Sequence, residues 1–229
     1  GTPTYILHLA KVAEENGIDP RSLGVKAICT GGEPGAMSIP NTGLRLEKAW
    51  GSKIFDFCGT QETNYMAWMC DEGVGHINED LLYCEVLDPE TNEPVAPGES
   101  GKLVITDLVG KTHPCIRFET GDIVNGIESE SLCKCGRTLS IFKGFRGRTG
   151  DIIKVRGVCV SVAGIENVIR GIKECSNNYE YLAVKNGTGM DQIKVRIEPQ
   201  SDIASERWDD IRKKVAESLQ LAFMVNMDV

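Results

Sequence analysis

Residues 142 to 157 of this 229-residue chain combine basic side chains with glycines. The stretch holds five basic residues and one acid: Lys143, Arg146, Arg148, Lys154 and Arg156, with Asp151. Guanidinium and ammonium groups bind oxyanions, and the planar guanidinium fork suits phosphate best. The whole chain has a net charge of −8, which argues against sequence-independent nucleic-acid binding. The stretch therefore predicts a site for one small anion.

Four other residues have the chemistry of metal ligands. Cys70 and His76 lie six residues apart, and Cys133 and Cys135 form a Cys-x-Cys pair. Three sulfurs and one imidazole complete a tetrahedral zinc site, and a closed site of this kind is structural rather than catalytic. The alternative is that the cysteines are reduced core thiols and that His76 is a hydrogen-bonded loop residue.

Cysteine usage and hydropathy indicate the cellular compartment. The chain has nine cysteines, an odd number, and no charged leader precedes an apolar core at its start. No stretch approaches the length of a membrane span. We therefore expect a cytoplasmic globular protein in a reducing environment, with neither a membrane nor a nucleic acid as partner.

The elements that position these residues fall into two sets. In the first, apolar periodicity predicts a helix from Pro3 that stops before Gly17, then a βαβ-like unit with a strand at 25–29, a helix at 39–50 and a strand at 53–57. Further strands are expected at 81–87, 102–108 and 116–118. A loop rich in Pro, Asn and Gly joins the first two of these as a hairpin.

The second set is an α+β module. Its expected strands are at 152–155, 158–160, 181–185 and 193–197, and its helices at 162–172 and 205–219. The chain is therefore expected to combine an α/β part, a β-rich part and an α+β part.

Six motifs occur in an order and at spacings that resemble one family. They are TGGEP (30–34), DFCGTQE (56–62), GESGKLVIT (98–106), RFETGD (117–122), GRTGDIIKVRGVCVS (147–161) and GIE (164–166). Together they resemble the core motifs of the AMP-forming acyl- and aryl-CoA ligases, most of all the phenylacetate-CoA ligase branch. The resemblance covers nearly the whole chain.

The resemblance implies a fold of the adenylate-forming enzymes, of class α/β plus α+β. Residues 1–148 would be the distal part of the large adenylation domain, with a partial βαβ layer and a β-rich subdomain stabilised by structural zinc. Residues 149–229 would be a truncated C-terminal lid domain. Many phenylacetate-CoA-ligase-like proteins share the pattern of Cys70, His76, Cys133 and Cys135, which favours the zinc interpretation.

The resemblance also implies a two-step reaction. A carboxylic acid, expected to be an aryl carboxylate of aromatic acid degradation, reacts with ATP and Mg²⁺ to give an acyl-adenylate, and the thiol of CoA then displaces AMP. We expect the chain to be the second half of such a ligase, cut short at both ends and inactive alone. Its βαβ unit would leave an edge or an apolar face exposed, so we expect self-association, as a homodimer, or disorder near that face.

The resemblance assigns roles to individual residues. Asp122 would hold the ribose hydroxyls of ATP or the adenylate, because a carboxylate can accept from both. Glu62 would hold the magnesium ion. Glu33 and Pro34 would line the adenine and acyl pocket, and Arg148 would contact ribose or phosphate.

Two positions in the second motif depart from the family pattern. The family usually has D-x-Y-G-x-T-E, whereas this chain has Cys58 in place of the tyrosine and Gln61 in place of the threonine, with Gly59 between them. Cysteine has no aromatic face, so adenine stacking is reduced or supplied elsewhere. Gln61 can still donate a hydrogen bond to a phosphate oxygen.

The remaining roles concern movement and CoA. Gly150 stands where the family often has the hinge aspartate, and Asp151 follows it, so we expect the lid to rotate about these residues. Gly157 would lie where the pantetheine arm of CoA passes. Two alternatives to the CoA ligase stay open: a synthetase that adenylates a different acceptor, and a non-catalytic, zinc-stabilised binding or scaffold module.

Overall fold

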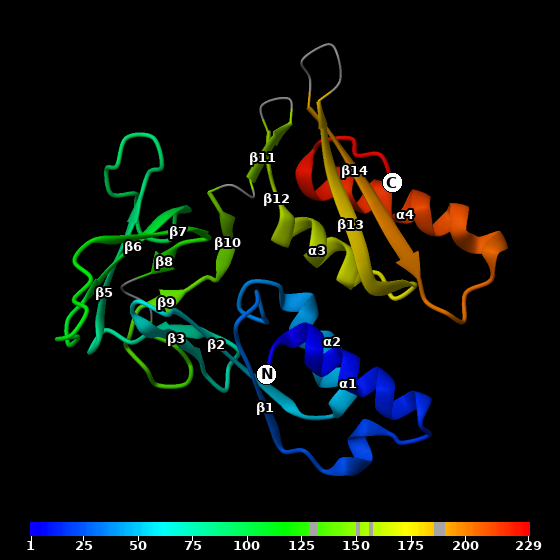
Figure 1. Ribbon diagram of the computed structural model, residues 1–229, viewed down its shortest axis with the longest axis horizontal. Coiled ribbons are helices and arrows are strands. Elements are labelled where there is room, and N and C mark those ends of the chain that lie inside the picture. Colours follow the sequence, from blue (N-terminus) through cyan, green and yellow to red (C-terminus); the bar gives the residue numbers. More distant parts are fainter. Residues whose placement is uncertain (129–131, 150–151, 156–157, 186–190) are drawn as a thin grey trace. The chain divides into compact units, whose positions relative to one another are not determined.

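The chain divides into two compact units, Gly1–Thr149 and Gly150–Val229. The structure is a computed structural model that describes residues 1–128, 132–149, 152–155, 158–185 and 191–229 (Figure 1). Among the described helices, none combines the length and the apolar character that a membrane crossing requires.

The first unit begins with an α/β layer. Its elements are α1 (Pro3–Glu15), the 3₁₀ helix η1 (Pro20–Leu23), β1 (Ala27–Thr30), α2 (Pro40–Trp50) and β2 (Lys53–Thr60). Strands β1 and β2 pair in parallel, which confirms the expected βαβ unit. A core of Ile6, Leu7, Ile28, Leu46 and Ile54 joins both helices to the two strands.

A β-rich part follows, in two sheets. The first sheet extends from β2 in the order β1-β2-β3-β4-β9-β8, with β3 (Asn64–Met69), β4 (Gly75–Ile77), β8 (Ile127–Glu128) and β9 (Ile141–Phe142). The second has the order β10-β7-β6-β5, with β5 (Leu82–Leu87), β6 (Gly101–Asp107), β7 (Phe118–Val124) and β10 (Phe145–Arg148). Both sheets contribute to one buried cluster that includes Met66 and Ile77 from the first and Leu103, Ile105 and Val124 from the second.

The sequence-based prediction was wrong about the length of β7, and it did not include β3, β4, β8, β9 or β10. The strand expected at 116–118 begins at Phe118 and continues to Val124, because Ile123 and Val124 pair with β6 on one side and Asp122 to Val124 pair with β10 on the other. The register with β6 shifts across Thr120 and Gly121, and the pairing beyond them outweighs the low strand propensity of glycine and aspartate. As a result Asp122 lies in a strand and not in a turn.

The second unit is an α+β module, as expected. Its elements are β11 (Ile152–Val155), β12 (Val158–Ser161), α3 (Val162–Gly171), β13 (Cys175–Lys185), β14 (Asp191–Pro199), the 3₁₀ helix η2 (Ser205–Arg207) and α4 (Trp208–Phe223). Strands β11 and β12 form one antiparallel pair, and β13 and β14 form another. Strand β13 begins six residues earlier than its apolar run predicted.

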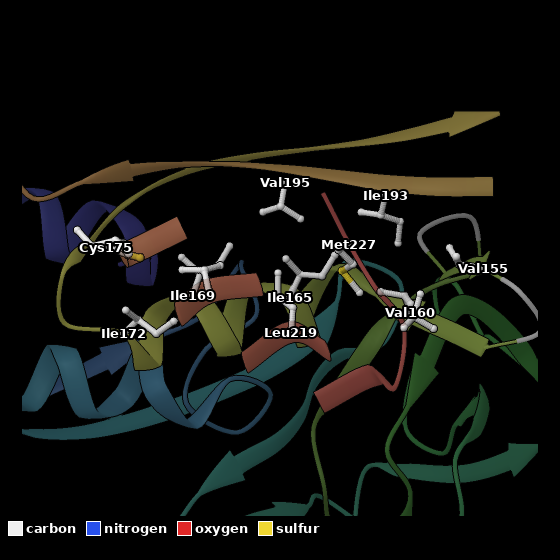
Figure 2. Packing of buried hydrophobic residues seen from close by; sticks show 13 residues of the cluster. Val155, Val160, Ile165, Ile169, Ile172, Cys175, Ile193, Val195, Leu219 and Met227 are labelled. Carbon is white, nitrogen blue, oxygen red and sulfur yellow. The ribbon is translucent and has the colours of Figure 1, made fainter. Parts of the chain in front are cut away.

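The helices of this unit pack on its strands through one apolar core. Ser161 caps α3, since its hydroxyl accepts a hydrogen bond from the backbone N–H of Gly164 at 3.2 Å. Figure 2 shows Ile165 of α3, Leu219 of α4 and Val195 of β14 in this core. Apolar residues recur at helical spacing in α3 and α4 and alternate in β14, and these patterns made the three elements predictable.

We predict that Leu219→Ala destabilises the second unit by about 2–5 kcal/mol, because it removes a completely buried side chain and leaves a cavity. Leu221→Ala is the matched control on the same helix, since Leu221 is 81% exposed. Urea denaturation followed by circular dichroism measures both. Equal losses of stability in the two variants would show that α4 does not pack as described.

Candidate nucleotide and metal-binding sites

Pairing of β7 with β10 brings two predicted site residues together. Arg148 lies opposite Asp122 in the antiparallel register, and its Nε donates to Asp122 Oδ1 at 3.1 Å. The Asp122 side chain is largely buried, whereas the Arg148 side chain is 68% exposed. Because a carboxylate can accept about four hydrogen bonds, Asp122 can hold Arg148 and still accept from the hydroxyls of a ligand. The pair thus presents an acceptor and a cation side by side.

Three further hydrogen bonds hold the backbone around this pair. Thr149 donates twice to the carbonyl of Gly121, from its N–H at 2.9 Å and from its hydroxyl at 2.8 Å. Thr120 Oγ1 accepts from the N–H of Asp122 at 3.1 Å. Gly121 has a φ of +77°, a conformation that favours glycine. These bonds fix the position of Asp122 within β7.

The loop between β1 and α2 carries the next two predicted residues. Glu33 accepts hydrogen bonds from Thr4 in the first turn of α1, from its N–H at 3.2 Å and from its hydroxyl at 2.6 and 2.8 Å. Pro34 is exposed beside it. The N-terminal turn of a helix favours a negative charge, which suits this position of Glu33.

A carboxylate to which the sequence analysis gave no role lies under the same loop. Asp56 of β2 is only 2% exposed and accepts from Thr30 Oγ1 at 2.7 Å and from the N–H of Met37 at 3.0 Å. Burial raises its pKa, and these hydrogen bonds oppose the increase. An aspartate in the alternating strand KIFDFC, at a position expected to face the core, was the available indication of its importance.

The residues of the second motif, at the end of β2, differ in burial. Cys58 packs against the β-rich core, and burial raises the pKa of its thiol far above the usual value. A Cβ on Gly59 would collide with the carbonyl of Asn64, so the turn into β3 requires glycine there. Gln61 and Glu62 are exposed on that turn. Among the described residues, neither Glu62 nor Glu33 makes an ion pair with Arg148.

Aromatic side chains lie on the opposite face of β2 from Cys58. The ring of Phe57 contacts Tyr65 and Trp68, with centroids 5.2 and 5.1 Å away. A Cβ on Gly31 would lie 2.6 Å from that ring, so the first glycine of TGGEP allows Phe57 to approach the loop. An aromatic surface is therefore present next to the loop, although Cys58 does not provide it.

The four predicted metal ligands form one cluster. The side-chain ligand atoms of Cys70, His76, Cys133 and Cys135 all lie within 4.8 Å of one another. Cys70 Sγ is 3.9 Å from Cys133 Sγ, and Cys135 Sγ is 3.5 Å from His76 Nε2. Zinc bond lengths give tetrahedral edges of about 3.8 Å between two sulfurs and about 3.6 Å between sulfur and nitrogen. The donor set and its spacing therefore fit a zinc ion.

Two similar turns and one carbonyl position these ligands. The N–H of Gly73 donates to the carbonyl of Cys70 at 2.9 Å, and the N–H of Gly136 donates to that of Cys133 at 2.9 Å. His76 Nδ1 lies 3.2 Å from the carbonyl of Leu139, so a proton on Nδ1 leaves Nε2 free for a metal. The contact with this carbonyl could not be predicted from the sequence, because it depends on a backbone group and not on a side-chain type.

The electrostatics of Cys135 favour a thiolate. Burial opposes ionisation, but hydrogen bonds from the backbone of Arg137, from Cys133 and from the side chain of Arg137 lower its pKa to about 6. Arg137 Nη1 lies 3.6 Å from the sulfur. A thiolate is the form of cysteine that binds a metal.

Three predicted residues, Gly150, Asp151 and Gly157, lie outside the described residues. The expected hinge and the expected pantetheine passage therefore remain predictions.

Comparison with known proteins finds one matching family and several similar proteins. Residues 157–229 match the family of the AMP-binding enzyme C-terminal domain. Phenylacetate-coenzyme A ligase of Thermus thermophilus is 31% identical over 86% of this chain and 44% of its own length. That of Aromatoleum evansii is 28% identical over 96% of this chain and 49% of its own length.

A solved structure is similar over the whole chain. The crystal structure of 2-hydroxyisobutyryl-CoA ligase in the postadenylation state, in complex with R3-HIB-AMP, has a TM-score of 0.91 and 28% identity, and covers 100% of this chain and 49% of its own. The chain thus spans about half the length of the relatives it matches. It is homologous to part of the AMP-forming CoA ligases, and its residues 157–229 belong to the AMP-binding enzyme C-terminal domain family.

Proposed function

We propose that this chain is part of an ATP-dependent, AMP-forming aryl-CoA ligase. The observation that supports this proposal most is the contact between Asp122 and Arg148, because it joins two of the family's motifs and places a hydrogen-bond acceptor next to a cation. The relatives support it further, since they are phenylacetate-coenzyme A ligases. An aryl carboxylate, ATP and CoA would be its small-molecule partners.

The proposed reaction has two steps, adenylation and thioester formation. In the first, a carboxylate oxygen of the acid attacks the α-phosphorus of ATP, pyrophosphate leaves, and the acyl group is joined to AMP as a mixed anhydride. In the second, the thiol of CoA attacks the acyl carbon, its proton is lost, and AMP leaves with the electron pair of the broken C–O bond. The protein mainly has to position the reactants and stabilise phosphate charge.

Different residues of the chain would position the reactants and stabilise the phosphate charge. Asp122 would accept from the ribose hydroxyls, and the exposed guanidinium of Arg148 would hold a ribose or phosphate oxygen. The loop with Glu33 and Pro34 would line the adenine and acyl pocket. Glu62, exposed after β2, has the hard oxygen that magnesium prefers, and the ion would neutralise phosphate charge.

We further propose that Cys70, His76, Cys133 and Cys135 hold a structural zinc ion. The four-ligand set is closed and three of its members are buried, so a bound zinc would have no open position for a substrate. The ion would tie the turn between β3 and β4 to the segment before β9. It would therefore stabilise the β-rich part and leave the reaction to the nucleotide site.

The direct test of the proposed function is ATP–pyrophosphate exchange by a polypeptide of the relatives' length that contains this chain. Exchange that depends on an aryl acid supports adenylation, and release of a thioester after addition of CoA supports the ligase over a synthetase with another acceptor. Absence of exchange with a broad panel of aryl acids would contradict the aryl-CoA ligase. Exchange with aliphatic acids alone would correct the substrate class.

We predict that the purified chain carries about one zinc ion, and that Cys133→Ser lowers both its zinc content and its stability. Cys29→Ser is the control, because Cys29 is an exposed thiol of β1 outside the cluster. Elemental analysis and thermal denaturation measure the two effects. A metal-free wild-type protein prepared without chelator would overturn the zinc site.

We predict that Asp122→Ala weakens AMP binding by about 10- to 150-fold, the equivalent of about 1.5–3 kcal/mol for hydrogen bonds to a charged acceptor. Titration calorimetry measures the affinity. Asp88→Ala is the control, because Asp88 also accepts backbone hydrogen bonds but does so in the hairpin loop after β5. Unchanged affinity in Asp122→Ala would exclude Asp122 as a ribose ligand.

A further inference from the structure

The loop between β1 and α2 is anchored from below by one buried carboxylate. Asp56 on β2 is opposite Thr30 at the end of β1, and the hydroxyl of Thr30 donates to Oδ1 at 2.7 Å. Its other oxygen accepts from the N–H of Met37, seven residues farther along the chain than Thr30. One side chain therefore holds both ends of the loop that contains Glu33 and Pro34.

The loop backbone lies directly against this carboxylate. A Cβ at position 35 would collide with the oxygens of Asp56, so Gly35 is required for the loop to reach it. Only 2% of Asp56 is exposed, and a buried polar group is tolerated when hydrogen bonds satisfy it. The close approach and the hydrogen bonds are mutually dependent, because a larger residue at position 35 would lift Met37 away.

The far end of the loop in turn contacts the segment that carries Arg148. The hydroxyl of Ser38 accepts from the N–H of Phe145 at 3.0 Å. A Cβ on Gly144 would collide with the carbonyl of Met37, so the two segments touch through their backbones. Phe145 is the first residue of β10 and Arg148 is the last. Displacement of Met37 would therefore disturb the start of the strand that presents Arg148.

Resting on the proposed function, we propose that Asp56 is a positioning residue: it fixes the loop at 31–38 against β1 and β10, so that this loop and Arg148 keep the geometry needed for the nucleotide. An amide can reproduce the two hydrogen bonds that hold the loop, those with Thr30 and Met37. In Asp56→Asn, the side-chain carbonyl can accept from Met37 and the amide can donate to the hydroxyl of Thr30. The anchor therefore depends on hydrogen bonding more than on charge.

Amide hydrogen exchange of the full chain tests the anchor without any ligand. In Asp56→Ala we expect the exchange rate of the Met37 amide to rise about tenfold or more, because its acceptor is lost. In Asp56→Asn the rate should stay within about threefold of wild type. If Asp56→Ala does not fold, Thr30→Val serves instead, since it removes only the hydroxyl that orients the carboxylate.

The matched control is Ser52→Ala. Ser52 is also buried, immediately before β2, and its hydroxyl donates to the carbonyl of Val25 at 2.7 Å, away from the loop. It should leave the Met37 amide as protected as in wild type. An unchanged Met37 exchange rate in Asp56→Ala, or an equal rise in Ser52→Ala, would overturn the anchor.

AMP titration of the same variants separates this inference from the proposed function. We expect Asp56→Ala to weaken AMP binding about tenfold, Asp56→Asn to restore it and Ser52→Ala to leave it unchanged. If wild type does not bind AMP, the proposed function fails, and Met37 exchange still decides whether Asp56 holds the loop. If wild type binds AMP and Asp56→Ala binds it equally well, the positioning role is refuted.

Discussion

The antiparallel pairing of β7 with β10 is the constraint on which the candidate nucleotide site depends. It places Arg148 opposite Asp122, although the two residues are 26 positions apart in the chain. An ion pair with one exposed partner contributes little to stability, so its value here is orientation. Thr149 and Gly121 reinforce the register with two further hydrogen bonds.

Strand β10 is held in this position by contacts between the residues at its start and the loop after β1. Gly144 lets the backbone touch the carbonyl of Met37, and Ser38 accepts a hydrogen bond from Phe145. Met37 is bound in turn to Asp56. The loop after β1 and the strand that carries Arg148 are thus joined by backbone contacts, and a change in one reaches the other through groups that have little freedom to move.

The sequence predicted the parts of the fold that have a regular apolar period. Ile165 and Ile169 recur at helical spacing in α3, as do Ile211, Val215 and Leu219 in α4, and the βαβ unit follows from short apolar runs around a helix. Strand β7 was predicted too short because Thr120 to Asp122 lack alternation. The strand continues past Gly121, which has a positive φ, because Ile123 and Val124 pair with both β6 and β10. Such pairing involves residues far apart in the chain, so the local pattern of apolar residues does not predict it.

The candidate sites were predictable where residue types carry the chemistry. Cys70 and Cys133 are 63 positions apart, and they were grouped before the geometry was known because their ligand chemistry agreed with the Cys and His pattern of phenylacetate-CoA-ligase-like proteins. The role of Asp56 was not predictable, because it depends on backbone groups of Met37 and Gly35 that have no side-chain signature. The carbonyl of Leu139 behind His76 is a second case of the same kind.

A crystal structure of this chain with AMP tests most directly whether Asp122 and Arg148 bind the nucleotide. The account predicts that the ribose hydroxyls lie within hydrogen-bond distance of the Asp122 carboxylate, about 2.5–3.0 Å, with the guanidinium of Arg148 next to the ribose or phosphate. AMP bound elsewhere on the first unit, with Asp122 more than about 4 Å from the ribose, would contradict it.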